Sequence, residues 1–206
     1  AKVGEVFTNS PLRGRRNIVI NGAMQIAQRS TSETGLGASS GYFVCDRWRL
    51  GIANTDGRLT MSQVTDTPNG FANALKLECT TADTSIAANE IAILQTKFEG
   101  QDLQQLKKGT ADAEKLTVSF YVKGNAAATY TCKLQDNDNT RHNSQEFSVT
   151  TAWNRVVLTF DGDTSGVLDN DNDDSFRLEF WLHAGSTYTG GTHTSNTWNT
   201  TDNQIV

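Results

Sequence analysis

The chain has 206 residues, of which 36% are hydrophobic, and its 18 basic and 23 acidic residues give a formal charge of −5. This length can build one sizeable domain, and two domains are not required. An acidic surplus argues against general nucleic-acid binding, which needs a basic surface, and no window approaches the apolar length of a membrane span. We therefore expect neither nucleic acid nor a membrane as a partner.

The first 16 residues show little periodicity. They end in a basic group formed by Arg13, Arg15 and Arg16. Two interpretations of residues 1–16 stay open, namely a solvated leader or an arm that tethers the protein to a neighbouring subunit. Residues 17–206 contain no internal repeat or linker and are predicted to form one domain. Because a sandwich usually pairs its first strand with a late one, we expect the closing strand to lie beyond Val206.

Most of the domain alternates apolar and polar residues, which predicts half-buried strands. The predicted strands are 42–52, 58–64, 74–79, 91–98, 115–125, 128–135, 145–150, 152–160 and 175–185. A shorter apolar strand within 17–29 is predicted to break at Asn21-Gly22, a turn pair, and 30–41 is a Gly/Ser loop. Leucines at helical spacing between Gly100 and Gly109 predict one short helix. Together these features indicate an all-β fold, an antiparallel sandwich or barrel.

The three cysteines, Cys45, Cys79 and Cys132, cannot all pair with one another and form no CxxC motif. Each lies in an apolar or strand-like run. We therefore predict three free thiols in the core rather than a disulfide framework or a zinc site. Free thiols fit a protein that is assembled in a reducing cytoplasm.

Candidate catalytic residues are few. The histidines are His142, His183 and His193, and no nucleophile, metalloprotease or phosphate-binding motif accompanies them. His142 and His193 are predicted to be ordinary surface imidazoles. Glu179 is the one carboxylate that we would name for glycoside hydrolysis, and it lacks a partner carboxylate nearby in the sequence. We expect a protein without enzymatic activity.

An acidic loop precedes the last predicted strand and supplies hard oxygen atoms at alternate positions, as calcium sites do. The candidate ligands are Asp169, Asp171 and Asp173, with Asp161 and Asp163 able to join them in space. The loop does not match an EF-hand, because the glycine and glutamate that this motif requires are missing. Two interpretations stay open, a solvated acidic turn and a structural calcium site.

The strand predicted over 175–185 presents two different faces. Phe176, Leu178, Phe180 and Leu182 form the core face, and Arg177, Glu179, Trp181 and His183 form the other. If the strand containing Tyr121 belongs to the same sheet, these side chains make a polar and aromatic platform. Sugars pack their C–H faces on aromatic rings and exchange hydrogen bonds with charged side chains, so the platform is a candidate glycan site. The alternative is that a loop, either 30–41 or 184–206, or another subunit covers Trp181.

NIVINGAMQIAQR (17–29), followed by CDRWRL (45–50), resembles the opening of a family of bacteriophage virion proteins that includes tail-fibre proteins. The family is common in phages of marine bacteria and cyanobacteria. Residues 98–125, 150–166 and 180–191 continue the resemblance. The layout is also similar to carbohydrate-binding modules of the jelly-roll type, which open with a strand like Asn17 to Gly22 and place a tryptophan, here Trp153, before a late strand.

This resemblance implies a jelly-roll β-sandwich located in the virion, assembled in the cytoplasm of the bacterial host. It implies other virion proteins as partners, a homo-oligomer (a trimer if the protein is a fibre), a structural calcium ion, and attachment to a host-surface glycan. A purely structural protein, with the aromatic residues buried at subunit contacts, is the alternative. A polysaccharide-degrading tail spike is a third hypothesis and would need two or more carboxylates that converge in one groove.

Overall fold

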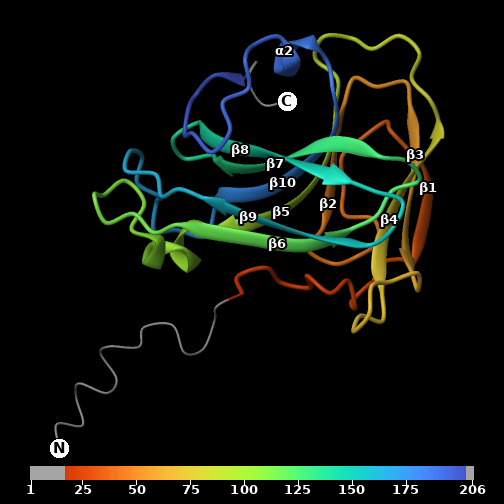
Figure 1. The fold of residues 1–206 in the computed structure, drawn as a ribbon, viewed down its shortest axis with the longest axis horizontal. Helices are drawn as coiled ribbons and strands as arrows, with labels where there is room; N and C mark the ends of the chain where they lie inside the picture. The colour runs from red at the N-terminus through yellow and green to blue at the C-terminus, as the bar shows by residue number, and fades with distance from the viewer. Residues whose placement is uncertain (1–16, 203–206) are drawn as a thin grey trace, which may run out of the picture.

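The computed structural model describes residues 17–202, and the predicted arm with Arg13, Arg15 and Arg16 lies outside these residues. The described chain is built from strands joined by turns and loops (Figure 1). The strands are β1 (Ser32–Leu36), β2 (Arg49–Ala53), β3 (Arg58–Val64), β4 (Ala74–Thr81), β5 (Ile91–Glu99), β6 (Leu116–Val122), β7 (Ala128–Asp136), β8 (Arg141–Val149), β9 (Asn154–Phe160) and β10 (Asp174–Ala184).

The strands form three antiparallel sheets. A five-stranded sheet has the order β2-β5-β10-β7-β8, a two-stranded sheet pairs β6 with β9, and a three-stranded sheet has the order β1-β3-β4. The β6-β9 ribbon packs on the five-stranded sheet, since the ring of Phe120 lies 4.8 Å from that of Phe180 and 5.0 Å from that of Phe147. The three-stranded sheet stands at one end, with its strands running across the direction of the others (Figure 1). The predicted all-β antiparallel jelly-roll sandwich is confirmed.

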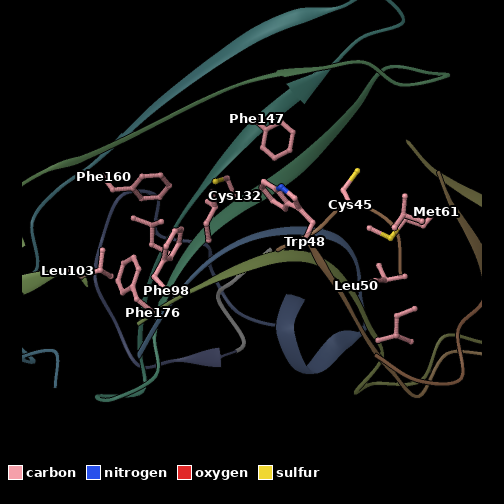
Figure 2. Packing of buried hydrophobic residues seen from close by; sticks show 14 of the residues in the cluster. Cys45, Trp48, Leu50, Met61, Phe98, Leu103, Cys132, Phe147, Phe160 and Phe176 are labelled. Atoms are coloured by element: carbon pink, nitrogen blue, oxygen red, sulfur yellow. The ribbon is translucent and has the colours of Figure 1, made fainter. Parts of the chain in front are cut away.

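The core runs the length of the sandwich between these layers. It extends from Leu103, Phe98 and Phe176 at one end to Leu50 and Met61 at the other (Figure 2). The alternation predicted for β10 is confirmed for Phe176, Leu178 and Phe180, which belong to this core. It is wrong for Leu182, which lies outside the core cluster, where the register of β10 shifts between Trp181 and His183. Packing of such side chains is the main favourable contribution to folding.

The three cysteines are free, as predicted, and two of them are buried. Cys45 and Cys132 lie in the core, where burial raises the pKa of each thiol, that of Cys45 to about 11. Both thiols are therefore protonated and unreactive at neutral pH. The prediction that Cys79 is also a core residue is wrong. It lies in the half of β4 that extends past the cover of the other sheets, where consecutive residues are exposed.

The predicted strand within 17–29 is wrong, because turns occupy this segment. Asn21 adopts a left-handed conformation, with φ of 56°, and its side chain accepts a hydrogen bond from the amide of Ile26 at 3.0 Å. A side chain that accepts a hydrogen bond from a nearby backbone amide offers that amide an alternative to pairing in a sheet. Conversely, β1 lies inside the predicted Gly/Ser loop, where it pairs with β3.

The helical segments are short. The prediction between Gly100 and Gly109 corresponds to two 3₁₀ turns, η1 (Gly100–Asp102) and η2 (Gln104–Leu106), which bury Leu103 and Leu106 at one end of the core. The α-helix α2 (Ser186–Thr189) follows β10 directly. Within residues 17–202, no helix has the length and the apolar character that crossing a bilayer requires.

Candidate functional site

The face of the five-stranded sheet that points away from the core, called the outer face below, carries a row of polar residues. The strand register aligns one residue from each strand across the sheet. The row consists of Arg49, Gln95, Glu179, Lys133 and Ser144. Of the sequence-predicted residues, Glu179 belongs to this row and Trp181 lies beside it on the same strand.

Lys133 and Glu179 form the centre of the row. Their side chains pair at 3.1 Å, and the indole nitrogen of Trp181 donates to the same Glu179 Oε2 at 3.0 Å. The Lys133 ammonium also lies 4.7 Å from the centre of the Trp181 ring, in a cation–π contact. With the Gln95 amide oriented so that its nitrogen faces Glu179, Gln95 donates to the other oxygen, Glu179 Oε1, at 3.1 Å. The carboxylate of Glu179 is thus fully occupied by protein donors.

This part of the outer face is covered. Only 3% of Glu179 and 4% of Trp181 is exposed, because residues 185–199 fold back over the strands. The ring of Tyr188, on α2, lies 5.2 Å from that of Trp181, and His193 bonds to the Ser144 hydroxyl at 3.0 Å. The prediction of Trp181 as an exposed platform residue is wrong, and the alternative, a loop within 184–206 that covers it, is what the structure has.

Some polar groups under this cover have no hydrogen-bond partner among the described residues. They include Thr131 Oγ1 and His142 Nε2 on the outer face. His142 is 1% exposed, so the prediction of a surface imidazole is wrong for this residue. Burial, followed by the positive charge of Lys133, lowers the pKa of His142 to about 4. The imidazole is therefore neutral at physiological pH.

The remaining predicted platform residues occupy different positions. His183 bonds to the buried carboxylate of Glu90 at 2.9 Å, at the far end of β10. Tyr121 lies on β6, in the two-stranded sheet, where its ring packs edge-on against Phe71 at 5.6 Å. The expectation that Tyr121 shares a sheet with β10 is wrong. Alternation shows which side chains share a face of one strand, but it does not show which strands pair.

Arg177 marks the point where the cover ends and the outer face becomes accessible. It pairs with Asp174 at 2.6 Å, and Lys97 on the neighbouring strand pairs with the same carboxylate at 2.5 Å. About a quarter to a third of each of these side chains is exposed. Burial alone would raise the pKa of Asp174, but hydrogen bonds from Arg177 and Lys97 outweigh it and hold the pKa below its usual value. Asp174 is therefore ionised at neutral pH.

A cleft of about 160 Å³ opens beside this ion pair, where β5 ends and β10 begins. Its lining, called the rim cleft below, combines one partly exposed aromatic ring with charged and amide side chains. These residues are Tyr42, Arg47, Lys97, Phe98, Glu99, Asn172, Asp173 and Asp174. Tyr42 is 36% exposed, and the Arg29 guanidinium lies 5.8 Å from the centre of its ring.

The loop that carries Tyr42 and Arg47 is held in place by the segment 17–29. The Asn21 amide donates to the Asp46 carbonyl at 2.9 Å, and the indole of Trp48 donates to the Asn21 carbonyl at 3.1 Å. Arg47, between them, has a φ of 72°, which is strained for a residue with a side chain. A strained backbone conformation persists only where contacts with the surrounding structure hold it in place, and such conformations are concentrated at functional sites.

The opposite wall of the cleft is the acidic loop, which packs on the 3₁₀ turns. A Cβ atom on Gly100 would stand 2.0 Å from the Asp169 carbonyl, so this close approach requires glycine. The amide of Gln101 donates to the Asp171 carbonyl at 2.9 Å, which fixes the loop further. The cleft thus lies between two loops that are each tied to the sandwich by several hydrogen bonds.

The acidic residues that we considered as calcium ligands are not brought together. Asp163 pairs with Lys108 at 2.9 Å and with Arg141 at 2.8 Å, and Asp161 pairs with Lys115. Asp171 accepts a hydrogen bond from the amide of Asp173 within its own loop.

Residues 17–202 contain no group of three or more acidic, histidine or cysteine side chains with the geometry to hold a metal ion. Calcium binding by Asp169, Asp171 or Asp173 stays a prediction, which calorimetric titration with calcium would test.

Several residues of the site were missed by sequence reasoning. Lys133 and Gln95 lie on strands that were predicted, and their outward positions follow from the alternation. Their partners on neighbouring strands could not be predicted, because alternation does not show which strands pair. Tyr42 and Arg47 belong to a segment that was predicted as strand and is a loop up to Trp48. The Asn21 and Asp46 side chains, both typical of turns, are the sequence features that could have indicated it.

Comparisons with solved structures gave a structural likeness for this chain. No family model matches the chain, and no curated protein matches it. A solved structure titled "CBM4 structure and function" is similar over 80% of this chain and 88% of that chain, with 15% sequence identity and a TM-score of 0.41.

Proposed function

We propose that this protein is a non-catalytic carbohydrate-binding module and that the rim cleft is where it holds a sugar. The observation that carries the proposal is the composition of the cleft, in which the ring of Tyr42 stands among the charged and amide groups of Arg47, Lys97 and Asn172. A sugar ring needs an aromatic surface for its C–H groups and paired donors and acceptors for its hydroxyls. A cleft of about 160 Å³ has room for one sugar unit at a time.

The rest of the outer face supports the cleft without touching the ligand. The buried pair of Lys133 and Glu179 fixes the strands whose ends carry Lys97 and Arg177. Polar groups with locked geometry lose little conformational entropy when a ligand binds, which favours affinity. We therefore assign Glu179 and Trp181 a supporting role, in place of the direct contact that the sequence suggested.

The ionised state of Asp174 supports binding without turnover. A glycosidase needs one protonated carboxyl group and one carboxylate on either side of the scissile bond. Of the three carboxylates that line the cleft, Glu99, Asp173 and Asp174, the last is held ionised by Lys97 and Arg177. Asp174 therefore has no proton to give as a general acid. Release of reducing ends from a polysaccharide incubated with the protein would contradict this part of the proposal.

The test of the site compares two exposed tyrosines. Tyr42, in the cleft, is 36% exposed, and Tyr121, on the other sheet, is 42% exposed. After a glycan array identifies a ligand, calorimetry should show that Tyr42→Ala weakens binding about tenfold or more, the loss of roughly 1.4 kcal/mol. Tyr121→Ala should leave the affinity unchanged. The opposite result, or a parent protein that binds no glycan on the array, would overturn the proposal.

We further infer, from the resemblance of residues 17–29 and 45–50, that the module serves a bacteriophage particle as a tail, fibre or decoration component. In that role it would attach the virion to a host-surface glycan and would associate with itself and with other virion proteins. Light scattering of the purified protein tests self-association, and a trimer is the expected state of a fibre component. Antibodies against the protein should label intact phage particles. If they do not, the proposal that the protein is a component of the virion is wrong.

A further inference from the structure

Lys108 lies in a buried ionic cluster at one end of the sandwich, whose members do not line the rim cleft. Its ammonium group contacts the carboxylate of Asp136, and it donates to Asp163 Oδ2 at 2.9 Å and to the Gly166 carbonyl at 2.9 Å. The exposed fractions of the three side chains are 4% for Lys108, 0% for Asp136 and 2% for Asp163. One amine and two carboxylates therefore meet in a place that is closed to bulk water.

One side of the cluster is lined by apolar side chains. The ring of Trp198 lies 5.0 Å from the Lys108 nitrogen, and Leu134 and Phe176 line the same side. Each member of the cluster comes from a different part of the chain: Lys108 follows the 3₁₀ turns, Asp136 ends β7, and Asp163 follows β9. Because the fold brings them together, the contact exists only in the native protein.

The two carboxylates have different partners. Arg141 binds Asp163 through two hydrogen bonds, at 2.8 and 3.0 Å, which keeps that carboxylate charged and fixed. Asp136 instead accepts, at Oδ1, a hydrogen bond from the backbone amide of Asn139 at 3.0 Å, and the Asn139 side-chain amide donates to both of its oxygens, at 3.2 Å to Oδ1 and 3.0 Å to Oδ2, while Oδ2 also contacts Lys108. Donation to Oδ1 draws electron density away from the carboxyl carbon and makes it more open to attack.

We propose that Lys108 and Asp136 form a covalent amide bond in the folded protein, with Asp163 as the group that moves the protons. Asp163 first takes a proton from the Lys108 ammonium group, which gives the nitrogen a lone pair. The lysine nitrogen then attacks the carboxyl carbon of Asp136, the bond from that carbon to Oδ2 breaks, and water leaves. Lys108 enters as an ammonium group and Asp136 as a carboxylate, so the two protons that the nitrogen loses are the two that make the departing oxygen into water. Asp163 accepts each from the nitrogen and passes it to that oxygen. No oxidant or external reagent is needed.

Two physical effects favour this reaction. The fold holds nucleophile and electrophile in contact, which can raise their effective concentration to about 10⁵ M or more. Burial then favours the product, because a neutral amide needs no solvation of the kind that a buried ion pair loses. Exclusion of bulk water also slows the reverse hydrolysis.

The chain contains a matched control for this reaction. Lys133 and Glu179 are also a buried lysine–carboxylate pair, with 6% and 4% of the side chains exposed. The Lys133 nitrogen, however, contacts Glu179 and the amide oxygen of Gln135, and among residues 17–202 no second carboxylate pairs with it that could move protons. We expect no covalent bond there.

The experiment is the intact mass of the full purified chain, measured after denaturation. We expect a mass lower than that of the sequence by one water molecule, and a tryptic peptide in which the segments of Lys108 and Asp136 are joined. A mass equal to that of the sequence overturns the proposal outright. A cross-link found at Lys133 in place of Lys108 also overturns it.

Two variants test the assigned roles. Lys108→Arg keeps a positive charge between the carboxylates but cannot form the bond, so it should fold and show the full sequence mass. Asp163→Asn retains both bonding partners and loses the proton carrier, so it should also show the full mass, with circular dichroism confirming the fold. If folded Asp163→Asn still loses one water, the role of Asp163 is wrong.

Discussion

The outer face of the five-stranded sheet has two halves that share strands and chemistry but differ in their access to solvent. Under the C-terminal segment, Lys133, Glu179 and Trp181 form a polar group that is closed on every side. At the other end, Lys97, Asp174 and Arg177 form a similar ionic group that is a quarter to a third exposed. The difference teaches that a polar row on a sheet face can stabilise the fold at one end and be available for binding at the other.

The largest change in the free energy of unfolding is expected for a substitution in the covered half of the outer face. Glu179→Ala leaves the Lys133 ammonium buried without its carboxylate, and we expect a loss of about 3–5 kcal/mol in the free energy of unfolding. Urea denaturation measures it. Asp66→Ala, which removes the partner of Lys123 at an exposed site, is the control and should change little. A similar small change in both variants would show that the two halves do not differ energetically.

The second prediction concerns pH. The folded protein keeps His142 neutral down to about pH 4, whereas the unfolded chain binds a proton below about pH 6.5. Between these values the unfolded state holds more protons, so stability should fall as the pH drops from 6.5 towards 4, by about 3 kcal/mol in total. Urea unfolding at pH 7 and pH 4.5 measures this. His142→Gln should abolish most of the loss, and His183→Gln should preserve it.

A third, smaller effect tests the cover itself. Tyr188→Ala removes the ring that packs on Trp181, and we expect a loss of about 1–2 kcal/mol together with a red shift of tryptophan fluorescence as water reaches the indole. Thr189→Ala, an exposed position on the same helix, should change neither quantity. Fluorescence that does not change in Tyr188→Ala would mean that other residues exclude water from Trp181.

The smallest stability effect is expected at the open rim. Arg177→Ala removes one of the two partners of Asp174, and the partial exposure of this ion pair limits the loss to about 1 kcal/mol or less. Lys97 still holds the carboxylate in this variant. Thermal unfolding measures the change. If Arg177→Ala lowers the free energy of unfolding as much as Glu179→Ala does, the residues at the rim stabilise the fold as strongly as those under the cover.

The fold could be predicted from alternation because each strand buries one face, as β10 does with Phe176, Leu178 and Phe180. The site could be predicted only in part. Arg177, Glu179 and Trp181 were placed correctly on the outward side of their strand, but their exposure depends on a C-terminal segment that has no periodicity and folds by individual hydrogen bonds. Tyr42 and Arg47 depend on the turn at Asn21, whose side chain acts on a loop that lies 25 residues further along the chain.

The C-terminal segment has a consequence for self-association that is separate from its cover of Trp181. β8 is the last strand of its sheet, and an unpaired strand edge is a template for joining other chains. Here Asn199 exchanges two hydrogen bonds with His142, each of 2.9 Å, and the Asn196 amide donates to the Ser144 carbonyl at 3.0 Å. These hydrogen bonds satisfy part of the edge of β8 with groups from the same chain. A cut before Asn196 would leave these groups of β8 free to recruit a strand from a second copy, and would favour open-ended polymers over discrete assemblies.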